Sequence, residues 1–496
     1  MSDVFVDDDD SAVATLLERV IRNGKRKRMR RMFLHELFDS EELAEIDGRG
    51  KFSAARPGGG NGASGRPDYW DSCWGRLLKE KNEQLEDLDS SESAVFRRRF
   101  RVPYPIFLKI VDAAKARFPE KQDAAKRPVV PLKLKVLGVL RVLGRATEFD
   151  GITELSGISE ETMRAFFHSF CKWFRDEIYP KFVHMPSTPD EAAEILAAYA
   201  RVGLPGAIGS MDVVHLAWCM CPAALGNLAT GKEGYPSVAY NVMCDHSGRV
   251  LCVLPGAYGA TNDKTIVQFD NFVDDVRTGP FFTGFGFEVR NGSDDGDREM
   301  VHGLWIIVDG GYHKWRALQA ASQVDNHPSY VAFRKTMESV RKDIEDVFGR
   351  LKNRFRVLKT PMTFHSKEKI DNVMFTCVAL HNMLLEWDCA FGKLMSWEVE
   401  AGWGNFTDED GADEGDARLW CRPKLVRQKR GYFIPDPEDD FSSCGSLSIP
   451  IGAGVALGAN TPPAPDEESA YYELHAKLVA HHAHSRAAHA VGWLRS

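Results

Sequence analysis

The chain has 496 residues, 44% of them hydrophobic and 27% charged, which is typical of a soluble protein long enough for more than one folded part. Its formal net charge of −8 argues against a uniformly basic nucleic-acid binder, although it leaves room for local basic surfaces. No apolar run approaches the roughly 18 residues of a membrane span. The N-terminus also lacks the pattern of a signal peptide, so we expect an intracellular protein without membrane contact.

Residues 1–94 have the composition of a region with little regular structure. An acidic run at Asp7–Asp10 is followed by a basic run at Lys25–Arg31, and a glycine-rich linker occupies residues 48–66. The basic run has three interpretations: a nuclear-import signal, an arm that binds phosphates, or the solvated face of a helix. The first of these leads us to predict that the protein is located in the nucleus.

Residues 95–204 show helical periodicity and form the second predicted region. Within it, a short helix ends at a glycine and a second helix begins after Ser159, whose side chain suits an N-cap. Two helices joined by such a turn resemble a helix-turn-helix, which places its second helix in the DNA major groove. That helix carries Arg164, His168 and Lys172, but two glutamates balance them. DNA recognition and plain packing therefore both stay open.

Residues 205–392 change to a pattern in which β-rich runs and helices mix. Strands are predicted over 207–218, 237–245 and 250–257, a helix over 263–276, and another buried strand that ends at Asp309. This order predicts an α/β domain in which helices cover a mixed sheet.

Three acids stand out by their context. Asp309 follows the apolar run Leu304–Val308 and precedes two glycines, Asp212 lies inside another apolar run, and Glu345 flanks the apolar stripe of a predicted helix. A carboxylate at the mouth of a buried strand needs a cation, because an unpaired buried charge is costly. One acid on each of two strands and a helix is the layout of a site for two Mg²⁺ ions about 4 Å apart. The alternative is that each acid is an ordinary turn or surface residue.

Six segments resemble, in the same order, the motifs of Harbinger-type DDE transposases, in the branch described as plant transposon proteins. They are GSMDVVHLAWCMCP at 209–222, GKEGYPSVAYNVMCD at 231–245, GAYGATNDKTI at 256–266, VDGGYHKW at 308–315, RKDIEDVFGRLKNRF at 341–355 and ALHNMLLEW at 379–387. In this resemblance the family's two aspartates fall on Asp212 and Asp309, and its glutamate falls on Glu345. One difference is Asp346, at a position that is often basic in the family.

The resemblance implies a ribonuclease H-like fold for residues 205–392, preceded by the all-α region. It also implies a transposase or endonuclease that cleaves and joins DNA, with two Mg²⁺ or Mn²⁺ ions held by Asp212, Asp309 and Glu345. Its partners would be double-stranded DNA, both element ends and target, and a Myb-like DNA-binding protein, and we also consider a homodimer. The alternative is a domesticated relative that binds DNA or a protein without catalysis.

Two further groups of residues have a functional and a structural interpretation. Asp263 could support the metal site without being a ligand. Alternatively, either Asn262 or Asp263 caps the helix that begins there, and we favour the cap. Arg350, Lys352 and Arg354 belong to a basic stretch beyond the glutamate, and the two arginines share a helix face because they are four residues apart. That face would either follow a DNA phosphate backbone or form solvated surface.

Histidines and cysteines offer weaker candidates. His215, Cys219 and Cys221 are close in sequence, but one Cys-X-Cys lacks a second ligand pair at zinc spacing, so we favour reduced, buried thiols. His381 lies beside the apolar stripe of a predicted helix and is interpreted as a core histidine. Residues 393–496 combine an acidic stretch with scattered histidines and are predicted to be a low-order tail.

Overall fold

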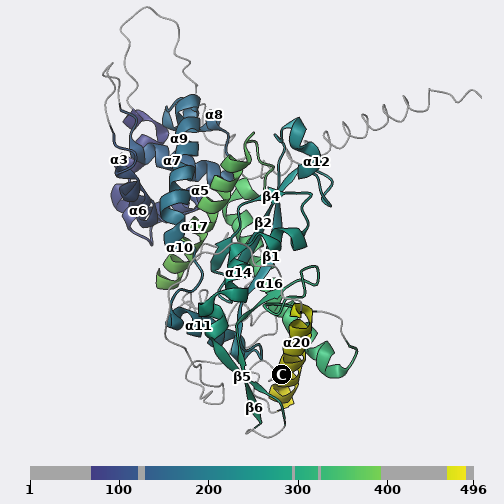
Figure 1. Cartoon of the computed structure of the whole chain (residues 1–496). Helices are drawn as coiled ribbons and strands as arrows, with labels where there is room; N and C mark the ends of the chain where they lie inside the picture. The colour runs from purple at the N-terminus through teal and green to yellow at the C-terminus, as the bar shows by residue number, and fades with distance from the viewer. Residues whose placement is uncertain (1–68, 121–128, 293–296, 322–324, 392–465, 488–496) are drawn as a thin grey trace, which may run out of the picture. The chain divides into compact units, whose positions relative to one another are not determined.

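The computed structural model describes residues 69–120, 129–292, 297–321, 325–391 and 466–487 (Figure 1). All of them belong to one compact unit that begins at Pro67. The basic run Lys25–Arg31, the glycine-rich linker and most of the predicted tail lie outside the described residues. Within the described part of the chain, no helix is both long enough and apolar enough to cross a membrane.

The first part of the described chain is built from helices. They are η1 (Tyr69–Asp71), α3 (Cys73–Glu80), α4 (Asn82–Glu86), α5 (Ser91–Phe100), α6 (Tyr104–Lys115), α7 (Leu132–Arg145), α8 (Phe149–Ser156), α9 (Glu160–Trp173), the π-helical turn η2 (Phe174–Ile178), α10 (Tyr179–Phe182) and α11 (Pro189–Arg201). Helices α3 and α4 lie in the region predicted to lack regular structure, so that prediction is wrong for them. The reason is that Trp74, Leu78 and Leu85 bury their side chains in the helical core, which offsets the polar sequence around them.

Helices α8 and α9 meet at a glycine turn, as predicted. Gly157, which follows α8, has a φ of 73°, in the left-handed region that glycine adopts without strain. Ser159 caps α9 by accepting a hydrogen bond from the Thr162 N–H. The buried face of α9 packs against α7, α8 and a much later helix, α17 (Lys367–Phe391). The second helix of the turn is therefore part of the protein core.

A six-stranded mixed sheet lies next to these helices. Its strands are β1 (Ala207–Ala217), β2 (Ser237–Cys244), β3 (Val250–Val253), β4 (Ala257–Tyr258), β7 (Trp305–Val308) and β8 (Leu318–Ala320). The order is β3-β2-β1-β7-β8, with β4 paired to β2. Strands β1, β2 and β3 are antiparallel neighbours, whereas β7 runs parallel to β1 and β8 parallel to β7. Strands β5 (Gly286–Arg290) and β6 (Arg298–His302) form a separate hairpin. The predicted mixed sheet is confirmed.

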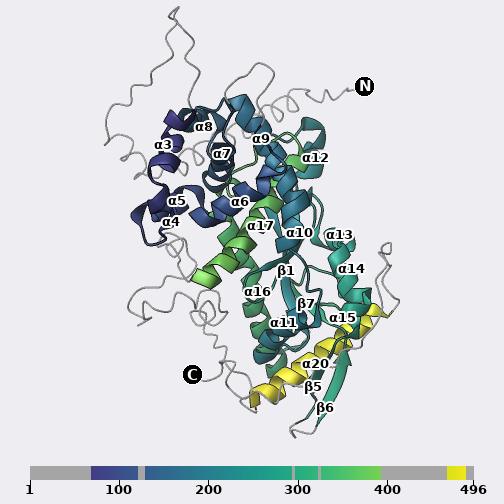
Figure 2. The same ribbon diagram turned by 90° about the vertical axis from the view of Figure 1, so that its left-hand side faces the viewer.

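Two hydrophobic cores flank the sheet. Successive residues of β2 go to different cores, Val242 and Cys244 to the first and Met243 to the second, as strand geometry requires. Helix α17 and the second half of α16 (Pro328–Arg354) pack with the N-terminal helices in the first core. Figures 1 and 2 show α17, in green, between those helices and the sheet. Helix α11 and the first half of α16 belong to the second core. The shorter helices are η3 (Ala223–Leu225), α12 (Gly226–Ala229), α13 (Asp263–Gln268), α14 (Asn271–Thr278), α15 (Pro280–Gly284) and η4 (Arg356–Leu358).

Helix α20 (Glu467–Ala487) departs from the low-order tail predicted for residues 393–496. It packs against β5, β8 and α16 through four buried apolar residues, Tyr471, Leu474, Leu478 and Val479. Histidines occupy the other positions of this buried face. Because histidine is polar, the sequence does not reveal the face as an apolar stripe. The ring of His475 lies 3.2 Å from the Gln319 side-chain oxygen, and the ring of His482 lies 3.0 Å from the Thr336 hydroxyl. Each buried imidazole thus has a polar partner from the second core.

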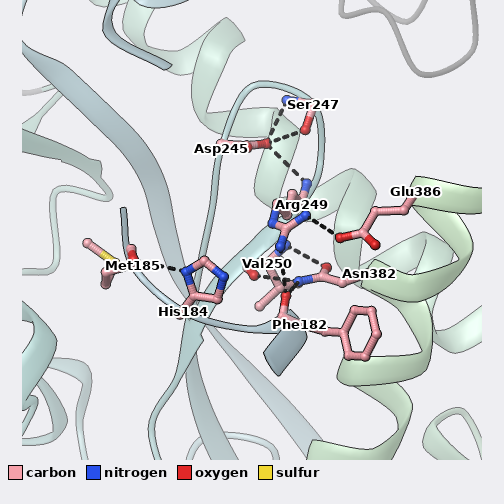
Figure 3. Close-up of polar contacts among 9 residues, drawn as sticks. All are labelled: Phe182, His184, Met185, Asp245, Ser247, Arg249, Val250, Asn382 and Glu386. Atoms are coloured by element: carbon pink, nitrogen blue, oxygen red, sulfur yellow. Dashed lines mark hydrogen bonds and ion pairs between the residues drawn. The ribbon is translucent and has the colours of Figure 1, made fainter. Parts of the chain in front are cut away.

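Asn382 of α17 closes the edge of the sheet at β3 (Figure 3). Its Oδ1 accepts the Val250 N–H at 3.0 Å, and its Nδ2 donates to the carbonyls of Val250 and Phe182, both at 2.8 Å. The amide takes the place of a neighbouring strand for backbone groups that would otherwise lack a partner. Next to it, His381 donates from Nε2 to the Gly248 carbonyl at 3.1 Å, which confirms its interpretation as a core histidine.

Candidate active site

Asp212 and Asp309 lie next to each other on neighbouring strands. The parallel strands β1 and β7 place Ser210 opposite Ile307, so two further residues along each chain bring the two aspartates to about the same level. Helix α16, which carries Glu345, packs against β1. Asp212 and Asp309 are therefore close to each other where β7 stops, and the helix that carries Glu345 packs beside β1.

Arg341 joins two of these acids. Its Nη1 lies 3.1 Å from Asp212 Oδ2, and its Nη2 lies 2.8 Å from Glu345 Oε1. The pair within α16 follows from helix geometry, because residues four apart share one face. The contact with Asp212 crosses from the helix to the sheet. Sequence analysis missed Arg341, and its only signal there was the spacing of four residues from the glutamate.

Asp309 stands at the open end of β7. Its side chain is exposed, and its Oδ2 accepts a long hydrogen bond, 3.4 Å, from the Gly311 N–H. A Cβ built on Gly310 would meet no atom within 4 Å, so the space beside the acid is free of protein. Among the residues that the structure describes, no three His, Cys, Asp or Glu side chains are arranged to hold a metal ion. With Arg341 in place, two of the candidate ligands are already engaged.

The charge around Asp212 favours a cation. Burial raises the pKa of its carboxyl, and the nearby Asp309 and Asp263 raise it further, while the Val213 N–H and Arg341 act in the opposite direction. One carboxylate oxygen, Oδ1, accepts the Val213 N–H at 2.8 Å. The other oxygen is the one that faces Arg341. Asp212 is thus a largely buried acid with one oxygen fixed by the backbone and one available to a cation.

A buried chain of hydrogen bonds holds the loop that follows Asp309. The Tyr312 hydroxyl donates to Asn241 Oδ1 at 3.1 Å, and Asn241 Nδ2 donates to Asp270 Oδ2 at 2.6 Å. Asp270 in turn caps α14 through its other oxygen. All three side chains are buried. The chain fixes the backbone immediately after the acid, and the sequence signals for it were the YNVMCD and VDGGY segments.

Asn262, and not Asp263, caps the helix in the TND segment. Asn262 Oδ1 accepts the Thr265 N–H at 2.8 Å, while Asp263 lies in the first turn of α13 with Lys232 Nζ 3.9 Å from its carboxylate. Asp263 is close enough to Asp212 to raise the pKa of that carboxyl. The favoured cap is therefore confirmed at Asn262, and the carboxylate of Asp263 adds to the negative charge of the site.

Arg350 and Arg354 share a helix face as predicted, but that face points into the protein. Their residues are only 5% and 1% exposed, so the prediction that they contact a DNA backbone is wrong. Arg354 Nη2 lies 3.3 Å from Asp388 Oδ2, and Arg97 Nη2 lies 2.7 Å from the other oxygen of the same carboxylate. These arginines connect α5, α16 and α17 inside the first core.

A different face of α16 carries the accessible cations. Lys342 is exposed and Lys352 is half-buried, and both share the face of Glu345 because they lie three and seven residues from it. Gly349 lies between them, and a Cβ built there would meet no atom within 4 Å. Arg356 in η4 is also half-buried. Positive groups and bare backbone therefore flank the acid on its own helix.

The three cations predicted for the second helix of the turn have partners within the protein. Arg164 pairs with Glu160, and Lys172 Nζ lies 3.1 Å from Asp176 Oδ2. The ring of His168 packs edge-on against Phe364, and burial lowers its pKa to about 4. This helix presents little unbalanced positive charge.

His215, Cys219 and Cys221 have separate partners. His215 Nδ1 lies 3.1 Å from the Ser237 hydroxyl, and the Cys219 thiol donates to the Met362 carbonyl at 3.1 Å. Cys221 faces the Pro222 carbonyl at 3.6 Å. The three side chains do not converge on one point in the described structure.

Comparisons with known proteins agree with the resemblance. Residues 176–390 match the family described as plant transposon protein. The chain is 22% identical to "Protein ALP1-like" of Arabidopsis thaliana over 329 residues, which is 64% of this chain and 75% of that protein. It is 25% identical to "Putative nuclease HARBI1" of Rattus norvegicus over 213 residues, which is 42% of this chain and 54% of that protein. It thus spans about half the length of this second relative. No solved structure matches the chain.

The family match contains all three candidate acids, Arg341, and most of α17. It begins near the end of the N-terminal helices and leaves out α20. Residues 176–390 thus resemble the plant transposon proteins, and the similarity to these relatives supports a Harbinger-type, transposase-derived family.

Proposed function

We propose that the chain is a metal-dependent DNA endonuclease of the DDE type, which cleaves and joins phosphodiester bonds on a ribonuclease H-like scaffold. The observation that carries the proposal is that Asp212 and Asp309 lie at the same level of β1 and β7, and that Arg341 joins Asp212 to Glu345 of α16. Family membership makes DNA the expected substrate, and a relative named as a nuclease supports the reaction type.

The three acids would hold two Mg²⁺ or Mn²⁺ ions, for which carboxylate oxygens are suitable ligands. The fit is supported by Arg341, because one cationic group already lies within 3.1 Å of oxygens from two of the acids. When bound, such ions activate a water or a 3′-hydroxyl and stabilise the charge that develops on the phosphate.

The residues of the chain prepare this site for a nucleic acid strand. The Tyr312 hydrogen bonds fix the loop beside Asp309, so the carboxylate keeps its position at the strand end. Gly310 and Gly349 leave open space on either side of the acids, where a phosphate backbone can approach closely. Lys352, on the same helix face as Glu345, is placed to contact a phosphate without reading sequence.

The test is Mg²⁺-dependent nicking of supercoiled plasmid by the full chain and by Asp309→Asn. Loss of a residue that hydrogen-bonds to a metal ligand typically costs roughly 10- to 100-fold in activity. We expect a larger fall in nicking here, because Asp309 is itself a proposed ligand. Glu338→Gln is the matched control, because it removes an exposed acid from α16 seven residues before Glu345 and should keep full activity. Thermal unfolding checks that both variants fold. Nicking that survives in Asp309→Asn would contradict the proposal.

The contacts of Arg341 favour a second candidate, a domesticated protein that binds DNA or a protein without catalysis. An arginine bound to Asp212 and Glu345 gives both acids a partner without any metal ion. This alternative predicts DNA binding that is unchanged by Mg²⁺ and by Asp309→Asn, with no nicking at any metal concentration. The same plasmid assay, combined with a binding assay, separates the two functions.

Target choice is proposed to depend on a Myb-like partner protein, with the chain acting in the nucleus, as a homodimer or alone. The support is that Arg164 and Lys172 of α9 are already paired with acids, so this helix has little charge left for a DNA groove. The need for a partner is tested by comparing the affinity of the isolated chain for element ends with its affinity for random duplex. Discrimination of roughly 10³-fold or more by the isolated chain, within the range of specific binders, would refute the need for a partner.

A further inference from the structure

The position of Arg341 suggests a role beyond holding the fold. Its guanidinium lies between an acid of the sheet, Asp212, and an acid of its own helix, Glu345, at 3.1 and 2.8 Å. On Asp212 it contacts Oδ2, the oxygen left free by the backbone, since Oδ1 accepts the Val213 N–H. A divalent cation held by these acids would need the same oxygens.

Charge compensation explains why a cation is needed there in the absence of metal. Asp309 and Asp263 both lie near enough to Asp212 to influence its ionisation. Unit charges about 4 Å apart interact by roughly 1 kcal/mol in water and about 4 kcal/mol near a protein surface. Without Arg341, repulsion among the acids would separate them or favour their protonation.

The contact is also easy to break. The Arg341 side chain is 18% exposed and that of Glu345 is 48% exposed, so water can replace the ion pair. The pair with Glu345 is of the exposed kind, which is worth about 0–1 kcal/mol, whereas the Asp212 carboxylate is 23% exposed and its pair is half-buried. The helix does not depend on Arg341 for its position, because Val340, Ile344 and Val347 anchor it in the core.

We propose that Arg341 is an exchangeable counter-ion, which keeps Asp212 and Glu345 together while no divalent cation is bound and leaves both when one enters. This inference rests on the proposed function, since it assumes that these acids bind metal. It assigns Arg341 a positioning role that sets metal affinity. The protein then trades some metal affinity for a site that is assembled before the metal arrives.

The experiment compares Mn²⁺ binding by the full chain, Arg341→Gln and Lys342→Gln, using calorimetry and the rise in melting temperature at saturating Mn²⁺. Arg341→Gln should bind Mn²⁺ roughly tenfold or more tightly, because a unit charge a few ångströms from the ligands is removed. Saturating Mn²⁺ should also raise the melting temperature of this variant by more than it raises that of the wild type. Lys342→Gln removes an exposed charge from the next position and should change affinity by less than about twofold at physiological salt.

The outcomes separate this inference from the proposed function. Equal or weaker Mn²⁺ binding by Arg341→Gln, with binding still abolished by Asp212→Asn, would refute the exchange and leave the metal site intact. Mn²⁺ binding that Asp212→Asn does not affect, or no binding by any variant, would refute the metal site and the exchange with it. Tighter binding in Arg341→Gln that Asp212→Asn cancels supports both.

Discussion

Two of the arginine–carboxylate bridges in the described chain, one at Asp388 and one at Arg341, differ in burial. At Asp388, the side chains of Arg97 and Arg354 are at most 6% exposed and connect α5, α16 and α17. At the candidate active site, Arg341 and its acids are between 18% and 48% exposed. The same chemistry thus serves as a permanent connection where water is excluded and as a replaceable one where water has access. Helix α16 carries one arginine of each kind, Arg341 and Arg354.

The largest expected effect is on the buried bridge. Asp388→Ala removes the carboxylate that Arg97 and Arg354 share, and breaking a buried pair of this kind typically costs about 3–5 kcal/mol. Arg341→Gln should lower the free energy of unfolding by less than about 1 kcal/mol, as exposed pairs do. Urea denaturation of the two variants measures both values. Similar losses would show that burial does not distinguish the two bridges.

The buried bridge should also be sensitive to acid, through His381 beside Arg354. Burial, together with Arg354, holds the pKa of His381 well below its ordinary value. In the unfolded chain this histidine has a pKa of about 6.5, so below that pH the unfolded state gains a proton that the folded state does not. The stability that this provides is fully present above pH 6.5 and falls by up to about 1.4 kcal/mol per pH unit below it.

Unfolding free energies measured between pH 7 and 5 test this. His381→Asn, which has no titrating group but can still donate to the Gly248 carbonyl, should have a shallower pH dependence by about one proton. The buried histidines of α20 contribute equally to both proteins, so the difference isolates His381. An unchanged slope would mean that His381 is charged in the folded protein.

The smallest expected effects concern DNA. Lys352→Gln and Arg356→Gln should each weaken binding a few-fold on every sequence and reduce the slope of log affinity against log salt by about 1. Lys172→Gln on α9 should change neither affinity nor sequence preference, because that lysine is paired with Asp176. Fluorescence anisotropy at several salt concentrations makes the comparison. A change of sequence preference in Lys172→Gln would show that α9 contacts bases.

The sequence was informative where a residue's context is local. Asp309 at the end of an apolar run, and the cap at Ser159, depend on neighbours within a few residues, and the structure places both as expected. The helix around Glu345 was also expected, although it begins earlier, at Pro328. Local sequence patterns of this kind therefore indicate the presence and type of an element better than its ends.

The sequence was less informative about which way a helix faces. Helical spacing predicts an apolar stripe in α16 that includes Phe348, but Phe348 is only half-buried, and the buried line runs through Ile344, Val347 and Leu351. This small rotation takes Arg350 and Arg354 from the surface into the core. The partners that make their burial acceptable, such as Asp388, lie far away in the sequence. Spacing alone cannot reveal them, nor the contact of Arg341 with a strand 129 residues earlier.

The bridge between Arg97 and Asp388 has a consequence for the order in which the protein forms during synthesis. The two residues are 291 positions apart, and α17 is part of the core of the N-terminal helices. At roughly 5–20 residues per second, the ribosome needs about 15–60 s to make the chain between them. We therefore expect the first helices to stay incompletely packed, and to need chaperones, until the ribosome has released α17. Limited proteolysis of ribosome-bound chains that stop before or well after Asp388 would detect this delay, and equal resistance of the N-terminal helices in both would contradict it.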